Sequence, residues 1–238
     1  MKLLIKIPTR NRPEQFLSIL LKHIDFLDSK EDVSFLLTLD SDDDSMNNLE
    51  IRNALNSIES DSGIPILYLY EISLNKIHAV NRDLEDFQDW DILILSSDDM
   101  LPNKQGYDLI IKNDMKKYFP NLDGVLYYPD GFTPLNTMPI MGKRYYDRFG
   151  YIYNPNYISF FCDNEFHEVA GLLNKQYYSK EILFKHLHPC NTKDAKWDIL
   201  YEQNNSSWNY DQQVYIDRRK KMFGVTYDKI QCIDCYIG

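Results

Sequence analysis

Two adjacent carboxylates, Asp98 and Asp99, follow a run of four apolar residues, 92–95, and a pair of serines. A continuous apolar run of this length is typical of a strand that is buried on both faces. The end of such a strand lies at the rim of a sheet, where open α/β folds bind their ligands. Because neighbouring carboxylates repel each other, the pair needs a positive partner, and a divalent cation that holds a phosphate is one candidate. For so short a motif, the commoner explanation is a solvated turn that caps the next helix.

Polar runs also follow three other segments that we expect to be strands. These runs comprise residues 9–12, 40–44 and 75–76. The carboxyl ends of parallel strands meet at one edge of a sheet, so all four polar runs are expected to lie together. This convergence indicates a binding site more strongly than any one run does.

The first hundred residues alternate between apolar runs of strand length and segments with helical periodicity. In residues 13–27, apolar side chains recur at spacings of three and four, and Pro13 suits the first helical turn. Strands that alternate with helices predict a parallel, doubly wound α/β sheet. The expected strands are 3–7, 33–39, 64–70, 91–95 and 124–128, and the expected helices are 13–27, 46–60, 76–87, 106–118 and 207–222.

The bulk composition narrows the classes of protein that fit. The chain has 238 residues, of which 44% are hydrophobic, and a net charge of −10, which argues against a broad nucleic-acid-binding surface but not against single nucleotides. No apolar stretch approaches the roughly 20 residues that span a bilayer. The first residues lack the pattern of a secretory signal. The four cysteines show no disulfide framework, so we expect a cytoplasmic protein, with peripheral membrane association left open.

In their order along the chain, these motifs resemble one known family. Residues 7–12 are similar to the first-strand signature of GT-A fold glycosyltransferases, especially the family-2-like group, and residues 40–44 resemble its acidic nucleotide-binding loop. Residues 75–82 resemble its Gly-Lys…Asn-Arg segment, and residues 97–99 its DxD-type motif. The resemblance implies an α/β GT-A fold with a mostly parallel central sheet flanked by helices. It implies one domain over residues 1–238, made of a nucleotide-sugar-binding half (1–100), an acceptor-side half (101–205) and a C-terminal helix and tail (206–238).

The resemblance also implies where a nucleoside-diphosphate sugar, with a UDP-sugar favoured, would bind. Asp99 would hold Mn²⁺ or Mg²⁺, since these hard cations prefer oxygen ligands and can bridge two phosphates. As a Lewis acid, such a cation stabilises the departing nucleoside diphosphate. Arg10 and Lys76 are explained equally well by surface ion pairs, and Arg82 is explained better by one. The residues assigned to the nucleotide sugar are Pro8, Thr9, Arg10, Asp40, Lys76 and Asp98.

Transfer of a sugar to a hydroxyl needs a base within hydrogen-bond reach of that hydroxyl. The family places an acidic motif at the start of a helix in its acceptor half, and Asp163 and Glu165 have this character here. The motif departs from the usual Glu-Asp pairing, so both acids stay open as the base, with Asp163 favoured; a helix N-cap is the alternative role for Asp163. His188 resembles the late histidine that completes the metal site in many GT-A enzymes, with His186 as second choice. Imidazole suits Mn²⁺ better than Mg²⁺.

The leading hypothesis is therefore a metal-dependent, inverting glycosyltransferase that moves a sugar to a glycan or another hydroxyl acceptor. A sugar-phosphate nucleotidyltransferase fits less well, because that class typically has a glycine-rich loop after its first strand and residues 8–11 contain no glycine. A GT-A-like binding or scaffold protein without catalysis is the non-enzymatic alternative. The joint presence of Asp40, Asp98, Asp99 and His188 argues against it. The sequence assigns no role to Asp211.

Overall fold

The computed structural model describes residues 1–187 and 206–226. Its first half alternates strand and helix, as the periodicity predicts. Local signals set the helix ends: Pro13 opens the first helix, and the Asn48 side chain caps the second by accepting a hydrogen bond from the Ile51 amide. The elements are β1 (Leu3–Thr9), α1 (Pro13–Asp25), β2 (Val33–Asp40), α2 (Leu49–Ser62), β3 (Ile66–Glu71), α3 (Lys76–Asn81) and β4 (Ile92–Leu95).

In the described part of the second half, residues 100–187 and 206–226, the strands are shorter and three of the helices are longer than ten residues. Its elements are β5 (Met100–Pro102), α4 (Tyr107–Tyr118), β6 (Val125–Tyr127), β7 (Ile140–Gly142), α5 (Lys143–Asp147), α6 (Cys162–Leu172), β8 (Gln176–Tyr178), β9 (Phe184–His186), α8 (Trp208–Lys220) and the 3₁₀ turn η1 (Met222–Gly224).

A seven-stranded sheet in the order β3-β2-β1-β4-β7-β6-β8 forms the centre of the fold. The strands β3, β2, β1 and β4 are parallel, β7 is antiparallel to both β4 and β6, and β8 is parallel to β6. The strand β6 therefore runs in the same direction as β4. The expected α/β class with a mostly parallel central sheet is confirmed, and a separate two-stranded sheet, β5 with β9, lies beside it.

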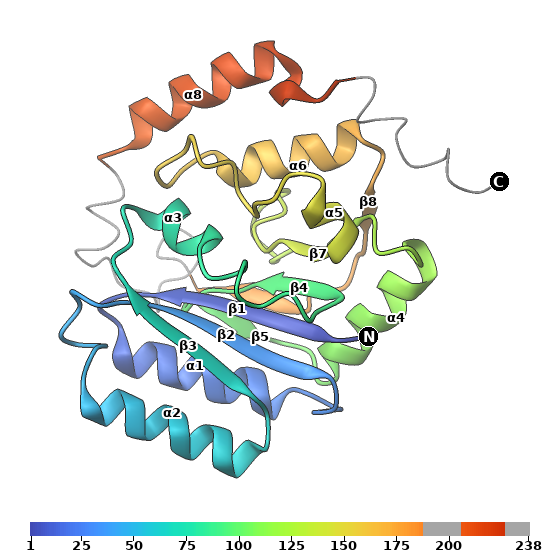
Figure 1. The fold of residues 1–238 in the computed structure, drawn as a ribbon. Coiled ribbons are helices and arrows are strands. Elements are labelled where there is room, and N and C mark those ends of the chain that lie inside the picture. Colours follow the sequence, from blue (N-terminus) through green and yellow to red (C-terminus); the bar gives the residue numbers. More distant parts are fainter. Residues whose placement is uncertain (188–205, 227–238) are drawn as a thin grey trace.

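Each face of the sheet has its own hydrophobic core. Helices α1, α2 and α4 contribute to one core, while α3, α5 and α6 contribute to the other, with α8 lying outside α6 (Figure 1). Strand β1 shows the alternation that builds both cores: Ile5 and Ile7 belong to the first, and Leu4 belongs to the second. Figure 1 also shows that the carboxyl ends of β1 and β3 and the first turns of α3, α6 and α8 lie at the same end of the molecule.

Two features differ from the sequence-based expectations. The helix expected over residues 76–87 ends at Asn81, whose side chain instead bonds the backbone of Ile152 and Tyr153 in a distant loop. Strands β5, β7, β8 and β9 have three residues each, too few for a period-2 pattern to be read from sequence. None of the helices in residues 1–187 and 206–226 has the length and apolar character that a bilayer crossing requires.

Candidate active site

The loop after β4 is held by the loop after β1. The Thr9 hydroxyl donates to Asp98 Oδ2 (2.8 Å), and Arg12 Nη1 donates to Asp98 Oδ1 (2.9 Å). Gln15 of α1 bonds the Asp98 carbonyl oxygen (2.8 Å). Burial and the adjacent Asp99 raise the pKa of Asp98 above its usual value, against the opposing effects of Arg12 and Thr9. Arg12 was not singled out from the sequence, although it belongs to the same polar run as Thr9.

The acid at the end of β2 is enclosed by two arginines. Arg10 Nη1 lies 2.8 Å from Asp40 Oδ2, and the Ser73 amide donates to Asp40 Oδ1 (3.1 Å). Arg82 Nη2 lies 3.7 Å from the same oxygen and donates to the Leu39 carbonyl at 2.6 Å. Arg82 was expected in a surface ion pair, but its side chain is only 6% exposed. Both arginines also bind a second carboxylate, Arg10 that of Asp42 and Arg82 that of Asp83, so Asp40 lies in a network of ion pairs.

The second carboxylate of the pair, Asp99, faces the β5–β9 sheet. The Ser97 hydroxyl donates to Asp99 Oδ1, and His186 Nε2 lies 3.4 Å from Asp99 Oδ2. Met100 pairs with His186 in the β5–β9 register, which brings the histidine to this carboxylate. Burial opposes ionisation of Asp99, but the hydrogen bond and charge of His186, the Ser97 hydroxyl and the charge of Lys76 together hold its pKa below the usual value.

A third acid, Asp130, follows β6 and was not identified from the sequence. It is buried, and its Oδ2 lies 3.9 Å from His186 Nδ1, so one imidazole lies between two carboxylates. The Asp130 carboxylate also accepts hydrogen bonds from Thr133 and Thr137. Because β6 is parallel to β4, the two strands end at the same edge of the sheet, and Asp130 therefore lies at the edge where the other strand-end acids lie. Its position in a stretch rich in proline and glycine concealed this from sequence reasoning.

The charge of Lys76 acts both on Asp99 and on Asp163 in the first turn of α6. Lys76 is the first residue of α3, where the Asn75 side chain caps the helix by accepting from the His78 amide (2.9 Å). Burial raises the pKa of Asp163, in the first turn of α6, while the charge of Lys76, two backbone amides and the charge of His186 oppose the rise. Coulomb interactions weaken with distance. The charge of Lys76, and that of His186 when the imidazole is protonated, act on both Asp99 and Asp163.

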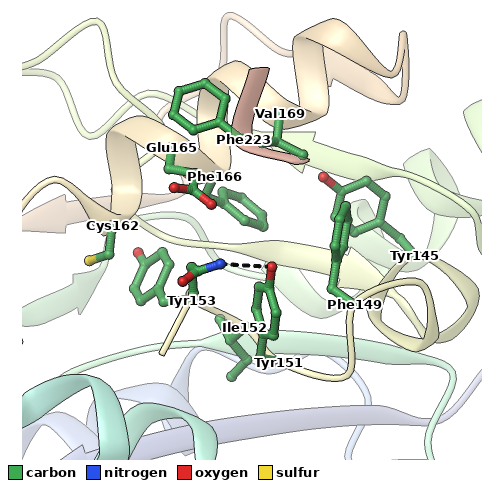
Figure 2. A pocket seen from close by; sticks show the side chains of 11 residues that line it. Tyr145, Phe149, Tyr151, Ile152, Tyr153, Cys162, Glu165, Phe166, Val169 and Phe223 are labelled. Carbon is green, nitrogen blue, oxygen red and sulfur yellow. Dashed lines mark hydrogen bonds between the residues drawn. The ribbon is translucent and has the colours of Figure 1, made fainter. Parts of the chain in front are cut away.

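The other candidate base, Glu165, lies in different surroundings. Arg218 of α8 binds it with two bonds of 2.7 Å each, and the Tyr157 hydroxyl donates to it at 2.7 Å. Figure 2 shows the Glu165 side chain at the edge of an aromatic hollow behind α6, which we call the α6 hollow. The hollow is lined by Tyr145, Phe149, Tyr151, Ile152, Tyr153, Asn154, Cys162, Glu165, Phe166, Val169 and Phe223.

The described residues supply some, but not all, of the ligands that a divalent cation needs. Asp99 and His186 supply a carboxylate and an imidazole side by side, and a cation that binds a diphosphate takes further oxygens from the phosphates and from water. No cluster of three or more His, Cys, Asp or Glu side chains suited to a metal is found in residues 1–187 and 206–226. His188, the first choice as a metal ligand, lies outside the described residues. Pro8 lies in β1 opposite Thr38 of β2.

No protein-family profile and no curated protein sequence matches the chain. Solved structures do match. A mannosyltransferase from Pyrobaculum calidifontis, in complex with GDP-Man and Mn²⁺, superposes with a TM-score of 0.61 at 12% identity, over 78% of this chain and 56% of that one. S. aureus TarS 1–349, in complex with UDP-GlcNAc, superposes with a TM-score of 0.62 at 13% identity, over 84% of this chain and 61% of that one.

These similarities establish the fold. The chain has the GT-A fold, as its motifs led us to expect. It spans 56% of the mannosyltransferase, and 37% of the longer TarS chain that it also matches. The structural neighbours bind nucleotide sugars or UDP, and one of them holds Mn²⁺.

Proposed function

We propose that the chain is a metal-dependent glycosyltransferase that moves a sugar from a nucleoside-diphosphate sugar to a hydroxyl acceptor. The observation that carries the proposal is the meeting of polar groups at the strand ends of a GT-A fold: His186 lies 3.4 Å from Asp99, and the charge of Lys76 acts on both Asp99 and Asp163. Donor binding and base catalysis need such a meeting, because the acceptor hydroxyl must lie between the base and the sugar carbon that it attacks.

On the donor side, Thr9, Arg10 and Asp40 line the ends of β1 and β2, where we place the nucleoside. Asp99 with His186, or with His188, would hold Mn²⁺ or Mg²⁺. When bound, the cation supplies positive charge to the diphosphate that leaves. Lys76 adds a second positive charge on the α3 side of the site. A UDP-sugar remains our favoured donor, and the acceptor is a glycan or another compound with a free hydroxyl.

On the acceptor side, Asp163 is the better base. Glu165 is neutralised by Arg218 and Tyr157, whereas Asp163 has a raised pKa and no cation in direct contact among the described residues. We infer one displacement step. Asp163 takes the proton of the acceptor hydroxyl, the oxygen bonds to the sugar carbon, and the bond from that carbon to the diphosphate breaks with inversion.

Calorimetric titration with UDP, with and without Mn²⁺, is the first test. We expect the wild type to need the metal for binding and Asp99→Asn to bind at least about tenfold more weakly in its presence. Asp61→Asn, which changes an exposed carboxylate on α2, serves as the matched control and should bind like the wild type. Wild-type affinity in Asp99→Asn would contradict the metal role.

A second measurement separates an enzyme from a binding protein. UDP-GlcNAc and GDP-mannose, the donors bound by the structural neighbours, begin a screen of sugar nucleotides for Mn²⁺-dependent hydrolysis. Release of a nucleoside diphosphate supports the proposal. Metal-dependent UDP binding with no turnover of any sugar nucleotide would favour the non-catalytic alternative.

A further inference from the structure

Helix α8 buries a carboxylate where a helix packed on a core normally buries apolar side chains. Asp211 is fully buried, and no other residue of α8, which is described throughout, is buried to that degree. The four oxygen contacts of Asp211 are all made by hydrogen-bond donors. Its carboxylate accepts from the backbone amides of Ile158 (2.8 Å), Ser159 (2.9 Å) and Phe160 (2.9 Å) and from the Ser207 hydroxyl (2.9 Å).

The three amides belong to the loop that leads directly into α6. After Phe160, the backbone passes through Phe161 in the left-handed region (φ 61°), and α6 begins at Cys162. A non-glycine residue is strained there and persists only when its surroundings fix it. The Phe161 ring packs against Trp208 and Tyr215 of α8, at centroid distances of 4.9 and 5.6 Å. The same helix therefore fixes both the amides of the loop and the strained residue that follows them.

The loop is also attached to α3. The Ile77 amide donates to the Ile158 carbonyl (3.3 Å), one residue after Lys76. Ile158 thus contacts Asp211 through its amide and α3 through its carbonyl. Between these two anchors, the loop sets where the first turn of α6, with Asp163, lies relative to the start of α3.

We propose that Asp211 is a positioning residue that holds the 158–161 loop, and through it Asp163, against the donor side of the site. The inference rests on the proposed function and adds a residue that touches neither donor nor acceptor. A carboxylate suits these contacts because both of its oxygens accept hydrogen bonds. In Asp211→Asn, one of those oxygens becomes an amide nitrogen that donates, and it then opposes the backbone amides that point at it.

The test compares Asp211→Asn with Asp217→Asn, an exposed carboxylate on the same helix that contacts Gln213 and Lys220. Hydrogen exchange of the amides of Ile158, Ser159 and Phe160 reports the loop, UDP titration with Mn²⁺ reports donor binding, and kcat and KM are measured with UDP-GlcNAc or GDP-mannose. In Asp211→Asn, we expect faster exchange, UDP affinity within about twofold of the wild type and a kcat about 10- to 100-fold lower. Asp217→Asn should match the wild type in all three.

The outcomes separate this inference from the function on which it rests. Absence of turnover of every sugar nucleotide in the screen by the wild type overturns the proposed function, and the inference falls with it. Wild-type turnover together with an unchanged kcat in Asp211→Asn overturns the inference alone. If Asp211→Asn fails to fold, Ser207→Ala decides, because it removes one of the four donors and keeps the carboxylate: a lower kcat at unchanged KM for the donor supports the inference, and an unchanged kcat overturns it.

Discussion

The first turn of α6 carries two carboxylates, Asp163 and Glu165, whose surroundings differ. The surroundings of Asp163 suit a catalytic base, whereas those of Glu165 suit a structural ion pair. Residues two apart on a helix do not share a face. Asp163 lies in the electrostatic environment of Lys76 and His186, with a pKa that burial raises. Glu165 lies against Arg218 and is bound by it at both oxygens. A carboxylate held by two charge-assisted hydrogen bonds is a poor proton acceptor. A partly buried carboxylate with a raised pKa is a better one.

Replacing each acid by its amide is the strongest test of which one is the base. We expect Asp163→Asn to lower the transfer rate at least about 100-fold, because a general base contributes on the order of 10²- to 10⁴-fold. UDP affinity in the presence of Mn²⁺ should stay close to that of the wild type. Glu165→Gln is the matched variant and should retain most of its transfer rate below its unfolding temperature. The opposite pattern, with activity lost only in Glu165→Gln, would reverse the assignment of the base.

Glu165 should matter most when stability rather than activity is measured. Glu165→Gln leaves the Arg218 guanidinium, which is 22% exposed, without its partner, and we expect unfolding free energy to fall by about 2 to 4 kcal/mol. Glu168→Gln is the control on the next turn: its partner Arg219 is 62% exposed and Glu168 also accepts from the Tyr215 hydroxyl, so the loss from the ion pair should be much smaller. Urea unfolding measures both. Equal losses would mean that Glu165–Arg218 behaves as a surface pair.

The contrast between the two acids also marks the limit of the sequence. The strands and helices of residues 1–95 follow from apolar residues that recur over segments long enough to show a period. The rule that parallel strands end at one edge of a sheet likewise brings Asp40, Asp98 and Asp99 together from their sequence positions alone. Periodicity failed for α3, which ends early because Asn81 bonds a loop about 70 residues later, at Ile152 and Tyr153.

The choice between Asp163 and Glu165 depended on a partner that no local pattern reveals. Arg218 is 53 residues from Glu165 in sequence and meets it only because α8 packs on α6. Asp130 was missed for a similar reason, since its neighbour His186 arrives through the pairing of β5 with β9. Local periodicity predicts the scaffold, whereas the neutralisation of each buried charge is settled by contacts between distant segments. The roles assigned to these residues stay predictions until the variants are measured.

A buried histidine, His23, supports the segment that follows β4 and is kept uncharged. It contrasts with Glu165 and Arg218 beside the α6 hollow, which form an ion pair. His23 of α1 is fully buried, with Nε2 2.9 Å from the Ser96 hydroxyl and Nδ1 3.1 Å from the Tyr107 hydroxyl. Burial lowers the pKa of His23 from 6.5 to about 3. Below pH 6.5, the unfolded chain therefore binds a proton that the folded chain does not, and stability falls as the pH falls.

We expect this histidine to make the fold sensitive to mild acid. Between pH 7 and pH 5, its contribution to unfolding free energy should fall by about 2 kcal/mol, since one pKa unit corresponds to about 1.4 kcal/mol. His23→Gln cannot titrate, so its unfolding free energy should fall less over this interval than that of the wild type. His78→Gln, at a partly exposed position on α3, should follow the wild type. Denaturant unfolding at several pH values checks the difference, and parallel curves for wild type and His23→Gln would contradict it.

The smallest effect distinguishes a satisfied from an unsatisfied hydroxyl beside the α6 hollow. The Tyr157 hydroxyl donates to Glu165, whereas the buried Tyr145 hydroxyl has no hydrogen-bond partner among the described residues. A buried polar group without a partner is unfavourable, so Tyr145→Phe should leave unfolding free energy unchanged or raise it by up to about 1 kcal/mol. Tyr157→Phe should lower it by about 1 to 2 kcal/mol, because it leaves part of the Glu165 carboxylate unpaired. Equal destabilisation by both variants, measured by thermal and urea unfolding, would show that the Tyr145 hydroxyl is bonded in solution, as it would be to a water molecule in the hollow.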